Sequence, residues 1–235
     1  MQRFITIATL VCCLILAACT SKQTNVGPAP QSGKVSYNIH YSRSIMSNRM
    51  SSFFPSKMVA TYNANGIRLD LKGPLGVYEF SIINFGDASN MLINLQGNRI
   101  YCPIEADSTF CDSLMLSKMY AESEITYSDS LTNIGGWMSK QMTVRYFTGA
   151  EQTMSMDVYF VPTCGKSRKI SNFPLEVLPG MVTAINIQHG TDVITIIADN
   201  VDSTAVSDKA FQIPDKYRVV NADEISTLLE TLADV

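Results

Sequence analysis

Residues 57–71 read KMVATYNANGIRLDL, two short runs of alternating apolar and polar residues on either side of a turn. Asn63-Ala64-Asn65-Gly66 joins the runs 57–62 and 67–71, and an Asn-Gly step between such runs is typical of a β-hairpin. Alternation with a period of two predicts strands that turn one face to a core. This stretch therefore predicts an antiparallel pair of strands.

The same pattern extends along the chain in both directions. Val35, Tyr37, Ile39 and Tyr41 would line one face of a first strand, and Gln96-Gly97-Asn98 supplies another turn. The short spacing of the runs favours antiparallel meander connections. We expect about ten strands, from runs at 35–41, 57–62, 67–71, 77–85, 91–95, 99–102, 124–133, 138–147, 153–161, 181–188 and 192–201.

Helical signals are few. Asp112 can cap a helix over 112–122, and Asn221, with Glu224 three residues on, can cap a helix over 221–235. In that last helix Ile225, Leu228, Leu229 and Leu232 follow helical spacing. The segment 44–56 fits either a short helix or a loop with an apolar tip.

These elements predict a mainly β fold of the α+β class, with two or three short helices. A sheet of about ten strands curls, splits or closes. We expect a strongly curved antiparallel sheet, an incomplete barrel, with the helices on its concave side. The apolar segments 44–56 and 112–122 are available to cover that side, and a ligand cavity would lie beneath them.

The start of the chain predicts export and lipidation. Arg3 precedes an apolar stretch over 4–18, which is short for a membrane span and suits a signal peptide over 1–18. Leu16-Ala17-Ala18-Cys19 resembles the lipobox of Gram-negative lipoproteins, in which the cysteine thiol takes a diacylglycerol and the mature chain carries acyl chains such as palmitate. The alternative is an ordinary secretory signal that is cut elsewhere, with a structural Cys19.

A lipidated Cys19 would hold the protein on a membrane, because two or more acyl chains anchor stably. Residues 19–32 are polar and rich in Gly and Pro, and predict a flexible tether with a reach of roughly 20 Å. Residues 33–235 then form a single domain. Thr20 follows the cysteine where an Asp would indicate inner-membrane retention, so we expect the outer membrane, facing the periplasm.

Composition narrows the function further. The chain has 18 Lys+Arg against 21 Asp+Glu, and this mild acidity argues against nucleic-acid binding. Cys102 and Cys111 flank a short loop, and a disulfide between them would restrict the unfolded chain by about 2.5–3 kcal/mol. Whether they pair stays open, as does the role of Cys164.

No catalytic or metal-binding motif is present in the sequence, so we expect no cofactor, no metal and no catalysis. His40 and His189 have no partner close in sequence, and alternation separates Asp192 from Asp199. An enzyme with dispersed catalytic residues remains an alternative.

Several apolar residues are candidates to line a ligand cavity. Each could equally pack in the core: Trp137 at a strand start, the others as covers over the sheet. The candidates are Phe53, Phe54, Met115, Leu116, Met119, Tyr120 and Trp137.

Three motifs stand in order in the second half of the chain. They are Ile134-Gly135-Gly136-Trp137 and Leu178-Pro179-Gly180-Met181-Val182, each at a step into a strand, and Phe211-Gln212-Ile213-Pro214-Asp215-Lys216-Tyr217 near the end. Together they resemble the strand steps and the closing motif of LolA-like periplasmic lipoproteins of unknown function. Order and spacing agree over roughly 125–217, while the first half agrees only in strand pattern.

The resemblance implies an incomplete β-barrel whose mouth is plugged by helices, with an apolar cavity for lipid or acyl chains. The functional residues of the true carriers have no counterparts here that can be matched one by one. We therefore expect an anchored lipoprotein that binds a hydrophobic ligand or a lipidated partner. The alternative is a structural lipoprotein whose core is filled by its own side chains. The oligomeric state is open.

Overall fold

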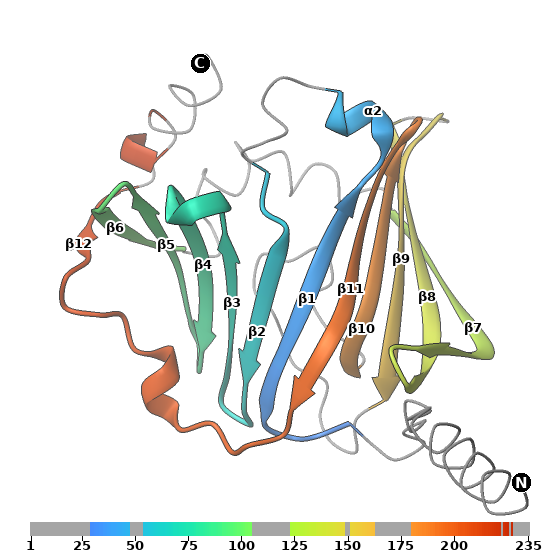
Figure 1. Cartoon of the computed structure of the whole chain (residues 1–235), viewed down its shortest axis with the longest axis horizontal. Helices are drawn as coiled ribbons and strands as arrows, with labels where there is room; N and C mark the ends of the chain where they lie inside the picture. Colours follow the sequence, from blue (N-terminus) through green and yellow to red (C-terminus); the bar gives the residue numbers. More distant parts are fainter. Residues whose placement is uncertain are drawn as a thin grey trace, which may run out of the picture.

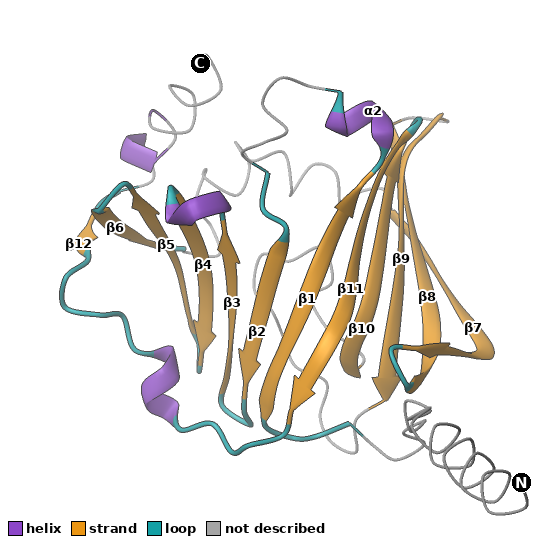
Figure 2. Cartoon of the chain, viewed as in Figure 1, coloured by secondary structure: helices purple, strands orange, loops and turns teal. Residues whose placement is uncertain are grey.

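The computed structural model describes residues 29–47, 54–104, 123–148, 151–162, 180–221, 223–225 and 227. Their main feature is one sheet of twelve strands (Figures 1 and 2). The strands are β1 Gly33–Tyr41, β2 Lys57–Tyr62, β3 Gly66–Lys72, β4 Tyr78–Phe85, β5 Ala88–Leu95, β6 Asn98–Pro103, β7 Ser123–Ile134, β8 Trp137–Thr148, β9 Glu151–Pro162, β10 Gly180–His189, β11 Asp192–Asp202 and β12 Arg218–Val219.

The order across the sheet is β12-β6-β5-β4-β3-β2-β1-β11-β10-β9-β8-β7. Two meanders, β1 to β6 and β7 to β11, are joined through antiparallel pairing of β1 with β11. Strand β12 is the exception to the antiparallel pattern, because it pairs parallel to β6. The prediction of a mainly β, mostly antiparallel sheet is thus confirmed, with twelve strands where the sequence indicated about ten.

Local turn chemistry explains the hairpins. Asn63 Oδ1 accepts hydrogen bonds from the backbone N–H groups of Asn65 and Gly66, which closes the predicted turn between β2 and β3. Between β7 and β8 the two-residue turn Gly135-Gly136 has φ of 60° and 91°. Both values lie in the left-handed region that a type I′ hairpin turn requires, and glycine adopts them without steric cost.

The sheet has two faces that differ in what packs on them. We call the side that carries Val35, Tyr37 and Ile39 the apolar face. Register places further apolar side chains on it from every long strand, among them Leu69 of β3 and Ile196 of β11. The other side we call the strap face, because residues 203–217, the strap, cross it.

The strap packs on β3 to β6 through a small core of its own. Phe211 is buried against Ile83 and Leu92, and its ring stacks on Phe85 at 5.6 Å between centroids. Asp208 fastens the strap to the β2–β3 turn, since it accepts a hydrogen bond from Asn63 Nδ2 at 2.7 Å.

The C-terminal residues return to the apolar face. After β12, Asn221 Oδ1 accepts a hydrogen bond from the Glu224 backbone N–H at 2.9 Å, which confirms the predicted N-cap. Ile225 is fully buried with Ile93 and Ile100. The remaining members of the predicted stripe, Leu228, Leu229 and Leu232, lie outside the described residues.

The helices are short. Among the described residues they include α2 Arg43–Met46, η2 Pro74–Gly76 and η3 Asp208–Phe211, the last within the strap, and residues 223–225 are helical as well. The segment 44–56, for which the sequence left helix or loop open, begins as helix α2. Among the described residues no helix is long and apolar enough to cross a membrane.

Two residues assigned to the tether contact the domain. Ala29 is buried beside Val35, and Ser32 Oγ accepts a hydrogen bond from the Val206 N–H. The signal peptide, Cys19 and the first part of the tether lie outside the described residues, so those assignments stay predictions.

Candidate functional site

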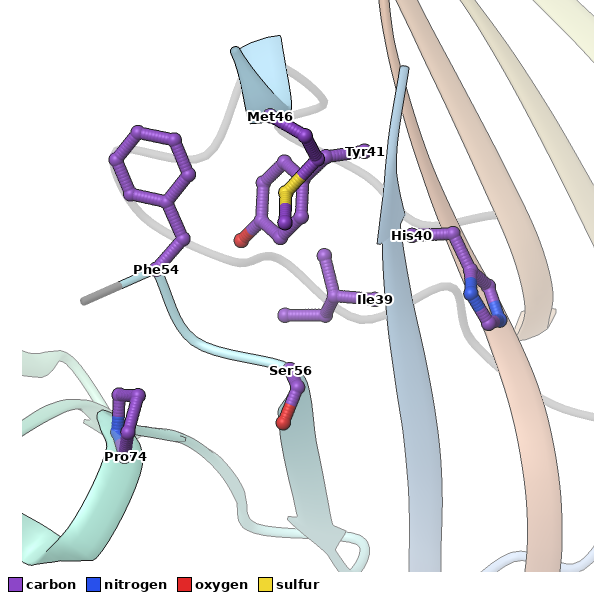
Figure 3. A pocket seen from close by; sticks show the side chains of 7 residues that line it. All are labelled: Ile39, His40, Tyr41, Met46, Phe54, Ser56 and Pro74. Atoms are coloured by element: carbon purple, nitrogen blue, oxygen red, sulfur yellow. The ribbon is translucent and has the colours of Figure 1, made fainter. Parts of the chain in front are cut away.

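A pocket of about 450 Å³ opens at the C-terminal end of β1, next to α2 (Figure 3). Strand β1 contributes three residues in sequence, α2 one, and the approach to β2 two. Its lining residues are Ile39, His40, Tyr41, Met46, Phe54, Ser56 and Pro74.

Tyr41 and Phe54 form the aromatic part of this pocket. Their ring centroids are 5.3 Å apart and the rings are tilted by 43°, a favourable aromatic geometry. The Tyr41 hydroxyl donates a hydrogen bond to the Pro55 carbonyl oxygen at 2.7 Å. The Ile39 N–H donates to the Ser56 carbonyl oxygen at 2.8 Å, so the segment 54–56 is tied to β1 beside the pocket.

The electrostatics of the pocket favour neutral contents. Burial, with a smaller contribution from the nearby Tyr78 phenol, raises the pKa of Tyr41 to about 12. Burial also raises the pKa of Tyr78. His40 is exposed and points away from the other lining side chains, across the β1 ribbon (Figure 3). None of the described lining residues is a carboxylate, a lysine or an arginine.

Exposed apolar side chains flank the opening. Met46 is 49 % exposed, and Leu75, next to Pro74 in the chain, is fully exposed. A Cβ at Gly73, which precedes Pro74, would collide with the Tyr78 ring, so glycine at this position lets the ring pack over the backbone.

From the pocket, a row of partly accessible apolar side chains continues along the apolar face of β2 to β5. We call this row the open stripe. Alternation brings its members to one face, and each is half-buried: Met58, Leu69, Leu71, Phe80, Ile82 and Met91.

The same face is tightly packed on β8 and β9, where the apolar side chains Met142, Val144, Met156 and Val158 are at most 3 % exposed. On β7, in register with Val144 and Met142, Ile125 is 47 % exposed and Tyr127 is 66 % exposed. Accessibility therefore varies from strand to strand along this face.

The sequence-predicted site residues are only partly brought together. Phe54 lines the pocket, whereas Trp137 is half-buried against the cluster of Val35 and Tyr62, towards the other end of β1. Trp137 thus packs at a strand start, one of the two interpretations considered. Phe53, Met115, Leu116, Met119 and Tyr120 lie outside the described residues.

The remaining candidates form no catalytic or metal-binding arrangement in the part that the structure describes. His189 is exposed at the end of β10. In this part of the chain no group of three or more His, Cys, Asp or Glu side chains could hold a metal. Cys102 is buried, while Cys111 and Cys164 lie outside the described residues, so the Cys102–Cys111 pairing stays a prediction.

The sequence did not indicate several residues of the site. The sequence places Tyr41 on a strand face without a functional role, Ser56 only at the end of the predicted cover segment 44–56, and Pro74 in no candidate site. Pro74 follows β3, and it reaches the pocket only because the pairings β1–β2 and β2–β3 bring η2 near β1. No local pattern encodes such a distance.

Comparison with known proteins adds little. No protein-family model and no curated protein sequence matches the chain. Among solved structures, the chain is similar to the crystal structure of LprF from Mycobacterium bovis, with a TM-score of 0.31 and 11 % sequence identity, over 78 % of this chain and 90 % of that chain. A similarity of this size carries no argument about the function of this chain.

Proposed function

We propose that this protein is anchored to a membrane of the cell envelope through lipidated Cys19 and binds a hydrophobic ligand on its apolar face, without catalysis. The ligand would be an acyl chain, a lipid or a lipidated partner. The observation that carries the proposal is the open stripe, which leads away from a pocket flanked by apolar side chains.

A contiguous row of partly accessible apolar side chains is the kind of surface that marks a ligand-binding groove. A ligand that covers them would remove them from water, and this burial would stabilise the complex by about 25 cal/mol for each Å² of apolar surface. The neutral pocket supports the same reading, because it offers aromatic and aliphatic contacts and no charged group to bind an ionic substrate.

A curled sheet is part of the proposal. The Tyr62 hydroxyl donates a hydrogen bond to Met181 Sδ at 3.6 Å, although β1 and β11 lie between β2 and β10. In a flat sheet those strands would be about 14 Å apart. The contact supports curling towards the apolar face, which would enclose a ligand on three sides.

The alternative is a structural lipoprotein whose apolar face is filled by its own chain. In that case the dense packing of apolar side chains on β8 and β9 would extend over the whole apolar face. Accessibility of the open stripe favours the binding function.

Native mass spectrometry of the purified protein, followed by lipid extraction, tests the proposal. We expect an acyl lipid to copurify with the wild type and to be largely lost from a Leu69→Gln/Ile82→Gln variant, which makes two cross-strand neighbours of the open stripe polar. Val59→Gln is the matched control, because Val59 is half-buried on the strap face. If the wild type neither copurifies with nor takes up an acyl lipid, the structural alternative holds.

A further inference from the structure

Asn84 is a polar side chain in an unexpected place. It lies near the end of β4 on the apolar face, in register with Ile67 on one side and Ser89 on the other. Asn84 is 6 % exposed and Ser89 is 7 % exposed. Both atoms of the Asn84 amide, Oδ1 and Nδ2, are buried, and neither has a hydrogen-bond partner among the described residues.

Native proteins rarely leave a buried amide unpaired, because burial removes its hydrogen bonds to water and the fold normally replaces them. Asn63, in the turn between β2 and β3, shows the usual arrangement of a buried amide. Its side chain forms hydrogen bonds with Asp208 and with backbone groups. The two free atoms of Asn84 offer one acceptor and one pair of donors at a single point.

That point lies at the far end of the open stripe from the pocket. Along β4 the apolar face carries, in order, Tyr78, Phe80, Ile82 and Asn84. Tyr78 belongs to the pocket end, and six residues of strand span about 20 Å. This is close to the length of an extended long-chain acyl group.

We propose that Asn84, with Ser89 across from it, holds the neutral polar head of an acyl amphiphile whose chain lies along the open stripe towards the pocket. This inference rests on the proposed function and specifies its ligand class. A head with adjacent donor and acceptor groups, such as the glycerol of a monoacylglycerol, complements the amide.

The described residues around Asn84 offer no charge that would balance an ionic head. Its neighbours on the apolar face, Ile67, Ile82 and Ser89, are uncharged. Arg68 lies on the strap face, where its guanidinium is paired with Asp70 at 2.8 Å. An anion buried at Asn84 would have no counter-charge among the described residues, which disfavours an ionised fatty acid or a phospholipid.

The test is native mass spectrometry of the full lipidated chain, titrated separately with 1-monopalmitoylglycerol, methyl palmitate and palmitate. In the wild type we expect monopalmitoylglycerol to bind at least tenfold more tightly than the other two, because only its head both donates and accepts while staying neutral. Asn84→Leu, which keeps the shape and removes both polar atoms, should abolish this preference without lowering the melting temperature.

Asn90→Leu is the matched control, the same change at a half-buried asparagine on the strap face of β5, and should leave the preference intact. Ser89→Ala provides a milder second variant, with an expected smaller loss, should Asn84→Leu fold poorly. If the wild type binds all three probes equally, or if Asn84→Leu keeps the preference, Asn84 is satisfied by buried water and the inference is wrong while the proposed function stands. If no probe binds, both are wrong.

Discussion

Tyr37 sits in the core of the sheet and donates its hydroxyl hydrogen to the Val182 carbonyl oxygen at 2.9 Å. Burial raises its pKa well above the ordinary value near 10, and the neighbouring Tyr62 phenol raises it further. A raised pKa means that the fold stabilises the neutral phenol. That contribution is complete below about pH 10 and is lost as the pH rises towards the folded pKa.

We therefore expect the free energy of unfolding to fall between about pH 10 and 12, where Tyr41 with its pKa of about 12 also begins to ionise. Tyr37→Phe should cost about 0.5–1.5 kcal/mol at pH 7 through the lost hydrogen bond, and should make the alkaline fall shallower. Denaturant unfolding at several pH values measures both effects. Tyr127→Phe, at an exposed position, should change neither; equal alkaline slopes for Tyr37→Phe and the wild type would contradict the assignment.

At the scale of elements, the residues after β11 pack on both faces of the sheet near its β6 edge. The strap covers the strap face of β3 to β6, β12 extends the edge beyond β6, and Ile225 closes the apolar face against Ile93. A single chain segment thereby shields an edge that would otherwise present unpaired backbone groups.

Ile225→Ala should lower the free energy of unfolding by about 2–5 kcal/mol, because it leaves a cavity beside Ile93 and Ile100. Asn221→Ala should cost about 0.5–2 kcal/mol through the lost cap. Asp223→Ala, an exposed change in the same segment, is the control in the same thermal-unfolding series. A wild-type melting temperature for Ile225→Ala would mean that this packing contributes nothing.

At the scale of the whole molecule, the proposed anchor and the described fold are separated along the chain. Residue 19 lies ten positions before Ala29, the first described residue that packs on the domain. In the proposed function the lipid would determine where the protein is held, and the sheet would determine what it binds.

Cys19→Ala should abolish membrane association and leave the domain folded, since the predicted lipid is the only anchor that we propose. Cell fractionation measures the first effect, and circular dichroism of the purified protein the second. Retention of Cys19→Ala in the membrane fraction, with no partner protein present, would contradict the lipid anchor.

Local sequence was sufficient for the elements of this fold. Each run of alternating residues became a strand within a few residues of its expected limits, and the turn at Asn63 and the cap at Asn221 formed as predicted. These features depend on neighbours in the chain, through side-chain alternation and backbone hydrogen bonds. Residues close in sequence carry that information themselves.

The tertiary structure alone decided the rest. Pairing of β1 with β11, the parallel β12 and the approach of Pro74 to Tyr41 join residues far apart in the sequence, and no local pattern ranks one long-range pairing above another. Asn84 is the clearest case. In the sequence it is an ordinary polar residue before a turn, and only the packed sheet buries its amide on an apolar face, where the absence of water makes each missing hydrogen bond costly.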